Sequence, residues 1–278
     1  MENTDAGGNE FRHNRRLLKV SVLATSSAGN CTFVGTDQTR ILIDAGLSRK
    51  ETFERMRSIG EDPDRLDAIL VTHEHSDHVS GLGVLSRYYR KLGRAVPVFM
   101  TRLTAPLIEW IGEAPPLEHF QAGTGFTIGD LEVQSFTIPH DAMDPVGYTV
   151  RSQGLKFGLA MDLGYMPDSV KYHLNRCHML VLESNHDVEM LKVGPYPWSV
   201  KQRVMGRKGH LSNDVVSDYI ASDLDGESQT LVLGHLSEHN NHPEIVRVVA
   251  SQALDRKGLD TRLVVAETRN PCEVFQLG

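Results

Sequence analysis

The chain has 278 residues, of which 40% are hydrophobic, and it carries a net charge of −7. This length is sufficient for one large domain or two small ones with a sizeable buried core. No run of about 18 apolar residues occurs, and the N-terminus lacks an apolar segment, so we expect neither a membrane partner nor a secretory signal. The acidic balance does not by itself indicate nucleic acid, but bound divalent cations would reverse the local charge and leave that partner open.

Three cysteines, Cys31, Cys177 and Cys272, are the only ones in the chain, and none belongs to a Cys-x-x-Cys motif. An odd, small number without motif spacing is typical of a reducing compartment. We therefore expect a cytoplasmic protein in which each cysteine is a small core residue.

The predicted elements run from a polar tail to a pair of closing strands. We expect residues 1–16 to form a disordered N-terminal tail and residues 17–278 to form one domain. Apolar runs bounded by turn-forming residues predict the strands. These strands cover residues 17–23, 32–34, 40–44, 68–71, 97–100, 126–128, 131–136, 146–150, 155–160, 178–182, 230–233, 262–266 and 273–277.

Helical spacing of apolar residues and end signals predict the helices. We place one over residues 50–59, one beginning near Val79, one from Thr101 toward Trp110, and one over residues 198–205. Ser212 or Asn213 would cap a helix continuing to Ile220, and Pro243 fits the first turn of a helix to Leu254. The alternation predicts two sheets packed face to face, with helices outside, in one α/β fold.

One heptapeptide, Thr72-His73-Glu74-His75-Ser76-Asp77-His78, directly follows the strand at 68–71. Neutral imidazole and carboxylate are natural ligands of a divalent cation. His73 and His75 alternate along extended chain and can point the same way. Asp77 and His78 are adjacent and cannot both share that direction, so two neighbouring metals would use all four residues. The alternative is a solvated polar loop after a strand, which does not account for this density of histidines.

Four further polar residues, His140, Asp162, His210 and His235, come just after apolar strands or at an interruption between helices. A site for two metals needs about three to four protein ligands per metal, with one shared carboxylate. We expect His73, His75 and His140 to bind one metal, and Asp77, His78 and His235 to bind the other. Asp162 would bridge both metals.

Several alternatives stay open at single positions. Asp162 could be a turn residue, and His140 a loop histidine. His235 is followed by His239 and His242, either of which could be the ligand instead. With the full set in place, a water bridging two zinc ions would ionise near neutral pH and attack an electrophilic centre.

The motif Thr-His-x-His-x-Asp-His, followed by separated His, Asp and His, resembles the metallo-β-lactamase superfamily over nearly the whole chain after the tail. This resemblance implies an αββα four-layer sandwich, with two mixed β-sheets face to face, outer helices and a dinuclear metal site at the sheet edges. Members include β-lactamases, thioesterases, lactonases and nucleases, so the fold does not decide the substrate.

Finer motifs are similar to those of the bacterial YycJ (WalJ) proteins, which are 5′→3′ DNA exonucleases. These motifs lie at residues 26–30, 183–187, 196–198, 209–213 and 235–241. The stretch Gly209-His210-Leu211-Ser212-Asn213 also resembles a motif of ribonuclease Z. That resemblance implies that His210 contacts the scissile phosphate or protonates the leaving oxygen, with Ser212 and Asn213 beside it.

The same resemblance implies further roles. Asp77 and His210 are the expected catalytic residues, and Asn30 and His186 are expected to line the substrate site. A tight structural turn is the alternative for the loop at 26–30. The chain departs from ribonuclease Z in lacking its long tRNA-binding arm, and from some β-lactamases in lacking a cysteine ligand.

The sequence thus predicts a phosphodiesterase with two divalent metals, zinc first and manganese as the alternative, that acts on nucleic acid and most of all on DNA. One alternative is a metallo-hydrolase of a small substrate, such as a cyclic nucleotide, thioester or lactone. Another is a non-catalytic regulatory protein that keeps metal for stability. The sequence gives no indication of the oligomeric state.

Overall fold

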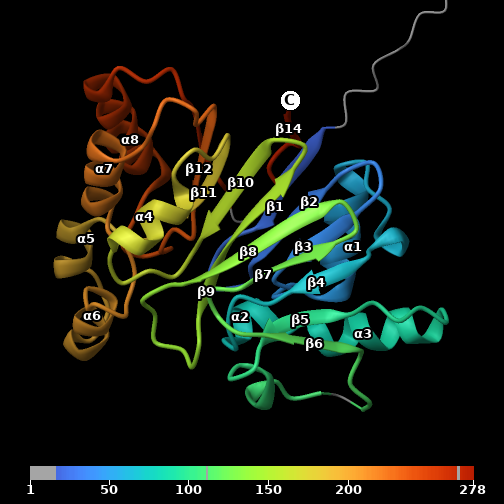
Figure 1. The fold of residues 1–278 in the computed structure, drawn as a ribbon. Coiled ribbons are helices and arrows are strands. Elements are labelled where there is room, and N and C mark those ends of the chain that lie inside the picture. Colours follow the sequence, from blue (N-terminus) through green and yellow to red (C-terminus); the bar gives the residue numbers. More distant parts are fainter. Residues whose placement is uncertain (1–16, 111, 268–269) are drawn as a thin grey trace, which may run out of the picture.

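Two mixed seven-stranded sheets lie face to face at the centre of the computed structural model (Figure 1). The structure describes residues 17–110, 112–267 and 270–278, so the expected tail at 1–16 lies outside the described residues. The first sheet has the order β14 (Phe275–Leu277), β1 (Leu18–Ala24), β2 (Cys31–Gly35), β3 (Arg40–Ile43), β4 (Ala68–Leu70), β5 (Val98–Thr101) and β6 (Leu117–Phe120). The second has the order β13 (Arg262–Val265), β12 (Thr230–Gly234), β11 (Met179–Glu183), β10 (Leu155–Ala160), β9 (Val146–Ser152), β8 (Leu131–Thr137) and β7 (Gly125–Ile128).

Helices cover the outer face of each sheet (Figure 1). Those beside the first sheet are α1 (Arg49–Ser58), α2 (Ser76–Val79) and α3 (Leu82–Lys91). Those beside the second are α4 (Asp168–Leu174), α5 (Val188–Val193), α6 (Trp198–Val204), α7 (Asn213–Ser222) and α8 (Pro243–Lys257). The predicted αββα sandwich is confirmed.

Three apolar layers hold the sandwich together. Side chains of both sheets, such as Val20 and Phe157, interlock between them. Phe53 of α1 and Leu85 of α3 pack on the outer face of the first sheet, and α7 places Ile220 on the second. Because each sheet is buried on both faces over much of its area, its central strands read as continuous apolar runs rather than as alternating ones.

Parallel strands deliver polar residues to one edge of the sandwich. β3 and β4 are parallel, as are β10, β11 and β12. Asp44, Asp162 and His235 follow three of these strands and adopt left-handed backbone φ values of 63°, 60° and 55°. Such values are uncommon outside glycine, and Asp and His tolerate them better than branched residues do. The backbone therefore turns sharply at the end of each of these three strands.

Two helix predictions need correction. The helix expected from Thr101 toward Trp110 is wrong, since only a 3₁₀ turn over Ala105–Leu107 forms there, and Pro106 lacks the N–H that a longer helix requires. The helix expected to begin near Val79 is divided in two: α2 is a single turn over Ser76–Val79, and α3 begins at Leu82. Asp77 and His78 therefore lie in a helical turn rather than in an extended loop.

One strand and two α-helices, β6, α4 and α5, were not expected from the sequence, and neither was a 3₁₀ turn over Pro63–Arg65. Cys31 and Cys177 are buried and Cys272 is half-buried, and all three are free thiols. Among the helices of the described residues, none has the length and apolar character needed to cross a membrane.

Candidate metal centre

Three histidines from two loops form the first half of the site. His73 Nε2 lies 3.1 Å from His75 Nδ1, and His140 Nε2 lies 3.3 Å from the same atom. One ring nitrogen of each lies within 4.8 Å of the others. His73 and His140 are buried and His75 is half-buried. The structure thus brings together the three residues predicted to bind one metal.

Asp162 occupies the middle of the site. Its Oδ2 lies 2.8 Å from His78 Nε2 and 3.8 Å from His73 Nε2, while its Oδ1 lies 2.7 Å from His235 Nδ1. Although burial favours a neutral carboxyl, His235 and His78 hold the pKa of Asp162 well below its ordinary value. An ionised carboxylate therefore faces both predicted halves of the site.

The ligand atoms of the second predicted set, Asp77, His78 and His235, lie farther apart than those of the first. Asp77 Oδ2 lies 3.4 Å from His78 Nε2 and 3.8 Å from His235 Nε2. His239 and His242, the open alternatives, are exposed, and the His242 side chain caps α8 by accepting from the Glu244 N–H. The structure places His235, rather than either of these, beside Asp162.

The chemistry of these donors fits divalent metal. Both oxygens of Asp162 and both ring nitrogens of His235 are buried without a hydrogen-bond partner among the described residues. His235 Nδ1 and Asp162 Oδ1 lie 2.7 Å apart, but the angles are not those of a hydrogen bond. Buried polar atoms are nearly always satisfied, so a cluster of unsatisfied imidazole and carboxylate atoms matches a metal site.

Asp44 is a site residue that the sequence reasoning missed. Its carboxylate lies 2.7 Å from His78 Nδ1 and accepts from the Thr72 N–H and hydroxyl. A carboxylate on one ring nitrogen leaves the other free to bind metal and fixes the orientation of the ring. Its place at the end of the predicted strand at 40–44 is the signal that could have identified it.

Glu183 is the second missed residue. It ends β11, is fully buried, and accepts from the Leu211 N–H at 3.1 Å and from the Leu163 N–H. Its Oε2 lies 2.9 Å from Nδ1 of the half-buried His210. Burial opposes protonation of His210, but Glu183, and to a lesser degree Asp162, raise its pKa to about 10. The imidazole is thereby held as a charged donor at the edge of the site.

His210 lies between the two halves of the cluster. Its ring centroid is 5.3 Å from that of His140 and 5.3 Å from that of His235. Glu183, His210, His235 and Asp162 also form a group of donors within 4.8 Å of one another, which could itself hold an ion. The geometry therefore allows His210 either a proton-donor role or a ligand role.

The residues predicted to bind substrate are buried. The Asn30 side-chain amide lies 3.0 Å from both Asp77 Oδ2 and His78 Nε2. Ser212 caps α7 by accepting from the Val215 N–H, and Asn213 accepts from the Ser184 hydroxyl at 2.7 Å. The side chains of three of the four thus have hydrogen-bond partners within the protein.

His186 is the fourth, and it forms an isolated bridge with Ser212. Its Nδ1 is buried without a partner among the described residues, and burial lowers its pKa to about 4. It therefore presents a neutral imidazole next to the start of α7.

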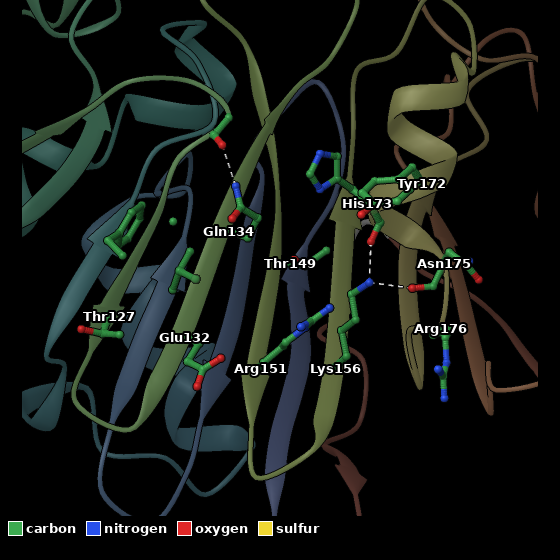
Figure 2. Close-up of a pocket in the computed structure, with 14 residues that line it drawn as sticks. Thr127, Glu132, Gln134, Thr149, Arg151, Lys156, Tyr172, His173, Asn175 and Arg176 are labelled. Atoms are coloured by element: carbon green, nitrogen blue, oxygen red, sulfur yellow. Dashed lines mark hydrogen bonds between the residues drawn. The ribbon is translucent and has the colours of Figure 1, made fainter.

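A broad groove lies elsewhere, on the outer face of β7–β10 beside α4 (Figure 2). Arg151 and Tyr172 line it, and Lys156 donates to the backbone carbonyls of His173 and Asn175 at 2.6 Å each. No predicted metal ligand lines this groove. It is distinct from the histidine cluster.

The chain is similar in sequence to one family model and to two exodeoxyribonucleases. Residues 39–235 match the family described as the Beta-lactamase superfamily domain. The chain is 41% identical over 244 residues to the exodeoxyribonuclease YycJ of Bacillus anthracis. This alignment covers 87% of this chain and 90% of that protein. The chain is 35% identical over 247 residues to the exodeoxyribonuclease WalJ of Streptococcus pneumoniae, with the same coverages of 87% and 90%.

Solved structures agree on the fold. The metallo-beta-lactamase fold protein YhfI from Bacillus subtilis matches with a TM-score of 0.72 at 16% identity, covering 94% of this chain and 100% of that one. Identity at this level supports the shared architecture and nothing about the substrate.

Proposed function

This chain belongs to the β-lactamase superfamily and, within it, to the family of the exodeoxyribonucleases YycJ and WalJ, and from that premise we propose that this metal-dependent hydrolase is a DNA exonuclease that degrades from the 5′ end. The names of these two relatives support DNA as the substrate. The finer features, two metals and 5′→3′ polarity, belong to this proposal.

Seven side chains would hold the metals: His73, His75, Asp77, His78, His140, Asp162 and His235. Two bound cations would supply a nucleophile from water at neutral pH and stabilise the charge that develops on the phosphate. Zinc suits these nitrogen and oxygen donors, with manganese as the alternative. The observation that carries the proposal is the convergence of these side chains beside the Glu183–His210 pair.

Three residues of the chain act around that centre. Glu183 orients His210 through the 2.9 Å contact to Nδ1, and His210 donates a proton to the leaving oxygen. Asp44 holds His78 in the orientation that leaves Nε2 toward Asp162. Because the carboxylates of Glu183 and Asp44 are buried, they hold His210 and His78 in place before the substrate binds.

End-labelled oligonucleotides test this function. The metal-loaded protein is incubated with single- and double-stranded DNA labelled at the 5′ or the 3′ end, with zinc, manganese or magnesium, and with Asp162→Ala as the inactive control. We expect the 5′ label to appear at once as a mononucleotide and the 3′ label to appear in a ladder of shortening products. A covalently closed circle of the same sequence should remain intact.

Each other outcome contradicts a stated part of the proposal. Cleavage of the circle would make the protein an endonuclease. Early release of the 3′ label would reverse the polarity. No cleavage with any of the three metals, alongside turnover of a thioester, lactone or cyclic nucleotide, would replace the nucleic-acid function with a small-molecule one.

A further inference from the structure

The segment from Val188 to Lys208, here called the α5–α6 segment, differs in charge from the rest of the chain. It contains five basic residues and one acidic residue, Glu189, in a protein whose net charge is −7. Four of the basic side chains are exposed, while Lys201 is buried and donates to the Lys192 carbonyl at 2.8 Å. The exposed basic residues are Lys192, Arg203, Arg207 and Lys208. This excess of positive charge complements a polyanion.

The same segment carries exposed apolar side chains. Trp198, at the first residue of α6, is 62% exposed, and Val193, at the end of α5, is 85% exposed. A large exposed tryptophan is uncommon on a surface with no partner. Basic residues interleaved with an exposed aromatic ring are the features that bind single strands, by phosphate contact and by base stacking.

The position of the segment connects it to the metal centre. Figure 1 shows α6 at the lower left, below α5, at the same end of the molecule as α2. Arg203 Nε lies 3.5 Å from Asp141 Oδ2, next to His140. Arg207 stacks on Tyr165 at 4.1 Å from the ring centroid, in the loop that follows Asp162.

The segment is fixed at both ends. The Asp187 N–H donates to the Asn240 carbonyl at 2.9 Å, and the His210 N–H donates to the Val204 carbonyl at 2.9 Å. A Cβ at Gly209 would lie 2.1 Å from the Val204 carbonyl oxygen, so only glycine allows this close return. Trp198 therefore stands at a set place, about 8 Å along the helix from Arg203.

We infer that the α5–α6 segment is a docking surface for the single strand of DNA that extends from the scissile phosphate, with Trp198 stacking on an unpaired base and the exposed cations contacting phosphates. This inference rests on the proposed function and specifies its substrate: a strand of several nucleotides binds better than a dinucleotide. The occupant is single-stranded because the bases of a duplex already stack on one another and leave no face for Trp198.

The groove in Figure 2 supplies matched controls. Tyr172, which lines it, is 76% exposed and so equals Trp198 as a surface aromatic. Arg151 makes no ion pair within the described part of the chain, and Arg176 pairs with Glu227 at 3.3 Å. They match Lys208, which is likewise unpaired within the residues that the structure describes, and Arg203, which pairs with Asp141.

Binding is measured by fluorescence anisotropy with the full metal-loaded chain. The probes are fluorescein-labelled phosphorothioate oligothymidylates of two and of twelve nucleotides, which resist cleavage. Trp198→Ala should raise the Kd of the longer probe by about 5-fold to 150-fold, the range for loss of one stacked base. Trp198→Phe should restore most of the affinity, and Tyr172→Ala should leave it unchanged.

The charge contribution is read from the salt dependence of Kd for the longer probe. Arg203→Gln combined with Lys208→Gln should reduce the magnitude of the negative slope of log (1/Kd) against log salt by about 1.4, since each contact to a single strand contributes about 0.7. Arg151→Gln combined with Arg176→Gln should leave the slope unchanged.

Two results would overturn the inference while leaving the nuclease intact. One is a parent protein that cleaves DNA but binds equally well after Trp198→Ala. The other is loss of binding in the groove variants alone, which would place the strand on β7–β10. A parent that neither binds nor cleaves DNA would instead reject the proposed function itself.

Discussion

His210 contacts both Glu183 and Asp162, so a single substitution can distinguish a proton donor from a metal ligand. If His210 is the proton donor, His210→Ala keeps the metal content and lowers turnover by about 10²-fold or more, the scale of general acid catalysis. Metal analysis by mass spectrometry, together with the rate on labelled DNA, checks both parts.

Glu183→Gln is the companion variant. This variant keeps the size of the side chain but removes the negative charge that orients His210 and keeps its imidazole protonated. We expect a loss in turnover that approaches that of His210→Ala, again with the metal retained. Loss of one equivalent of metal from either variant would show that the group of Asp162, Glu183, His210 and His235 binds an ion and that His210 is a ligand.

Asp44 makes a separate prediction about metal affinity. Asp44→Asn fits the left-handed backbone at φ 63°, because Asn tolerates this region, but it no longer offers a charged acceptor to His78 Nδ1. Loss of such a carboxylate partner costs about 10- to 100-fold in metal affinity. Competition with a chromophoric chelator measures the change, and an unaltered affinity would mean that the contact with His78 is structural only.

The seven ligands that the sequence predicts were chosen because each lies in a dense motif or directly after an apolar strand, and the structure places them in one cluster. The sequence did not predict Asp44 and Glu183, although they occupy the same kind of position. A carboxylate at a strand end has no distinguishing feature until the fold places a histidine 2.7 or 2.9 Å from it. Partner residues of this kind depend on tertiary contacts that local sequence does not contain.

At the level of elements, the turn after β3 fixes the heptapeptide. A Cβ at Gly46 would lie 1.6 Å from the Asp77 carbonyl oxygen, and the Ala45 N–H donates to the His78 carbonyl at 2.8 Å. The turn and α2 therefore touch through their backbones. This contact positions Asp77 and His78 together.

Gly46→Ala tests that contact. The added methyl group must push α2 outward, which costs about 1–3 kcal/mol and displaces two ligands at once. We expect a lower melting temperature and a metal content below that of the parent. Gly226→Ala is the control, because its nearest neighbour, Leu259 Cδ2, would be 3.9 Å away. Equal behaviour of the two variants would contradict a positioning role for the turn.

Elements with strong apolar patterns were predicted well, and short or amphipathic ones were not. β11 and β12 are continuous apolar runs and lie where we expected them. β6 reads Leu-Glu-His-Phe with both middle residues exposed, so it offers little apolar pattern. α2 was missed as a separate turn because it consists of Ser76, Asp77, His78 and Val79. The helical spacing of apolar residues lies mainly in α3, beyond it.

At the scale of the whole molecule, the predicted metal ligands come from both sheets. His73 and His78 follow β4 of the first sheet, whereas Asp162 and His235 follow β10 and β12 of the second. The chain pattern predicted two sheets but not the order of the strands within each sheet, because that order depends on long-range pairing. Ions held across the two sheets would act on the stability of the whole fold.

Removal of metal should therefore destabilise the protein. A ligand present at about 100 times its Kd stabilises the folded state by about 2.7 kcal/mol. At roughly 2–4 °C per kcal/mol for a chain of this size, EDTA should lower the melting temperature by about 5–10 °C, and added zinc should restore it. Asp162→Ala, which lacks the carboxylate between the two halves, should respond much less to either treatment. Calorimetry of the parent and of this variant, each with EDTA and with zinc, measures the difference. Identical melting temperatures for the parent in EDTA and in zinc would mean that the ligands of the two sheets do not share bound ions.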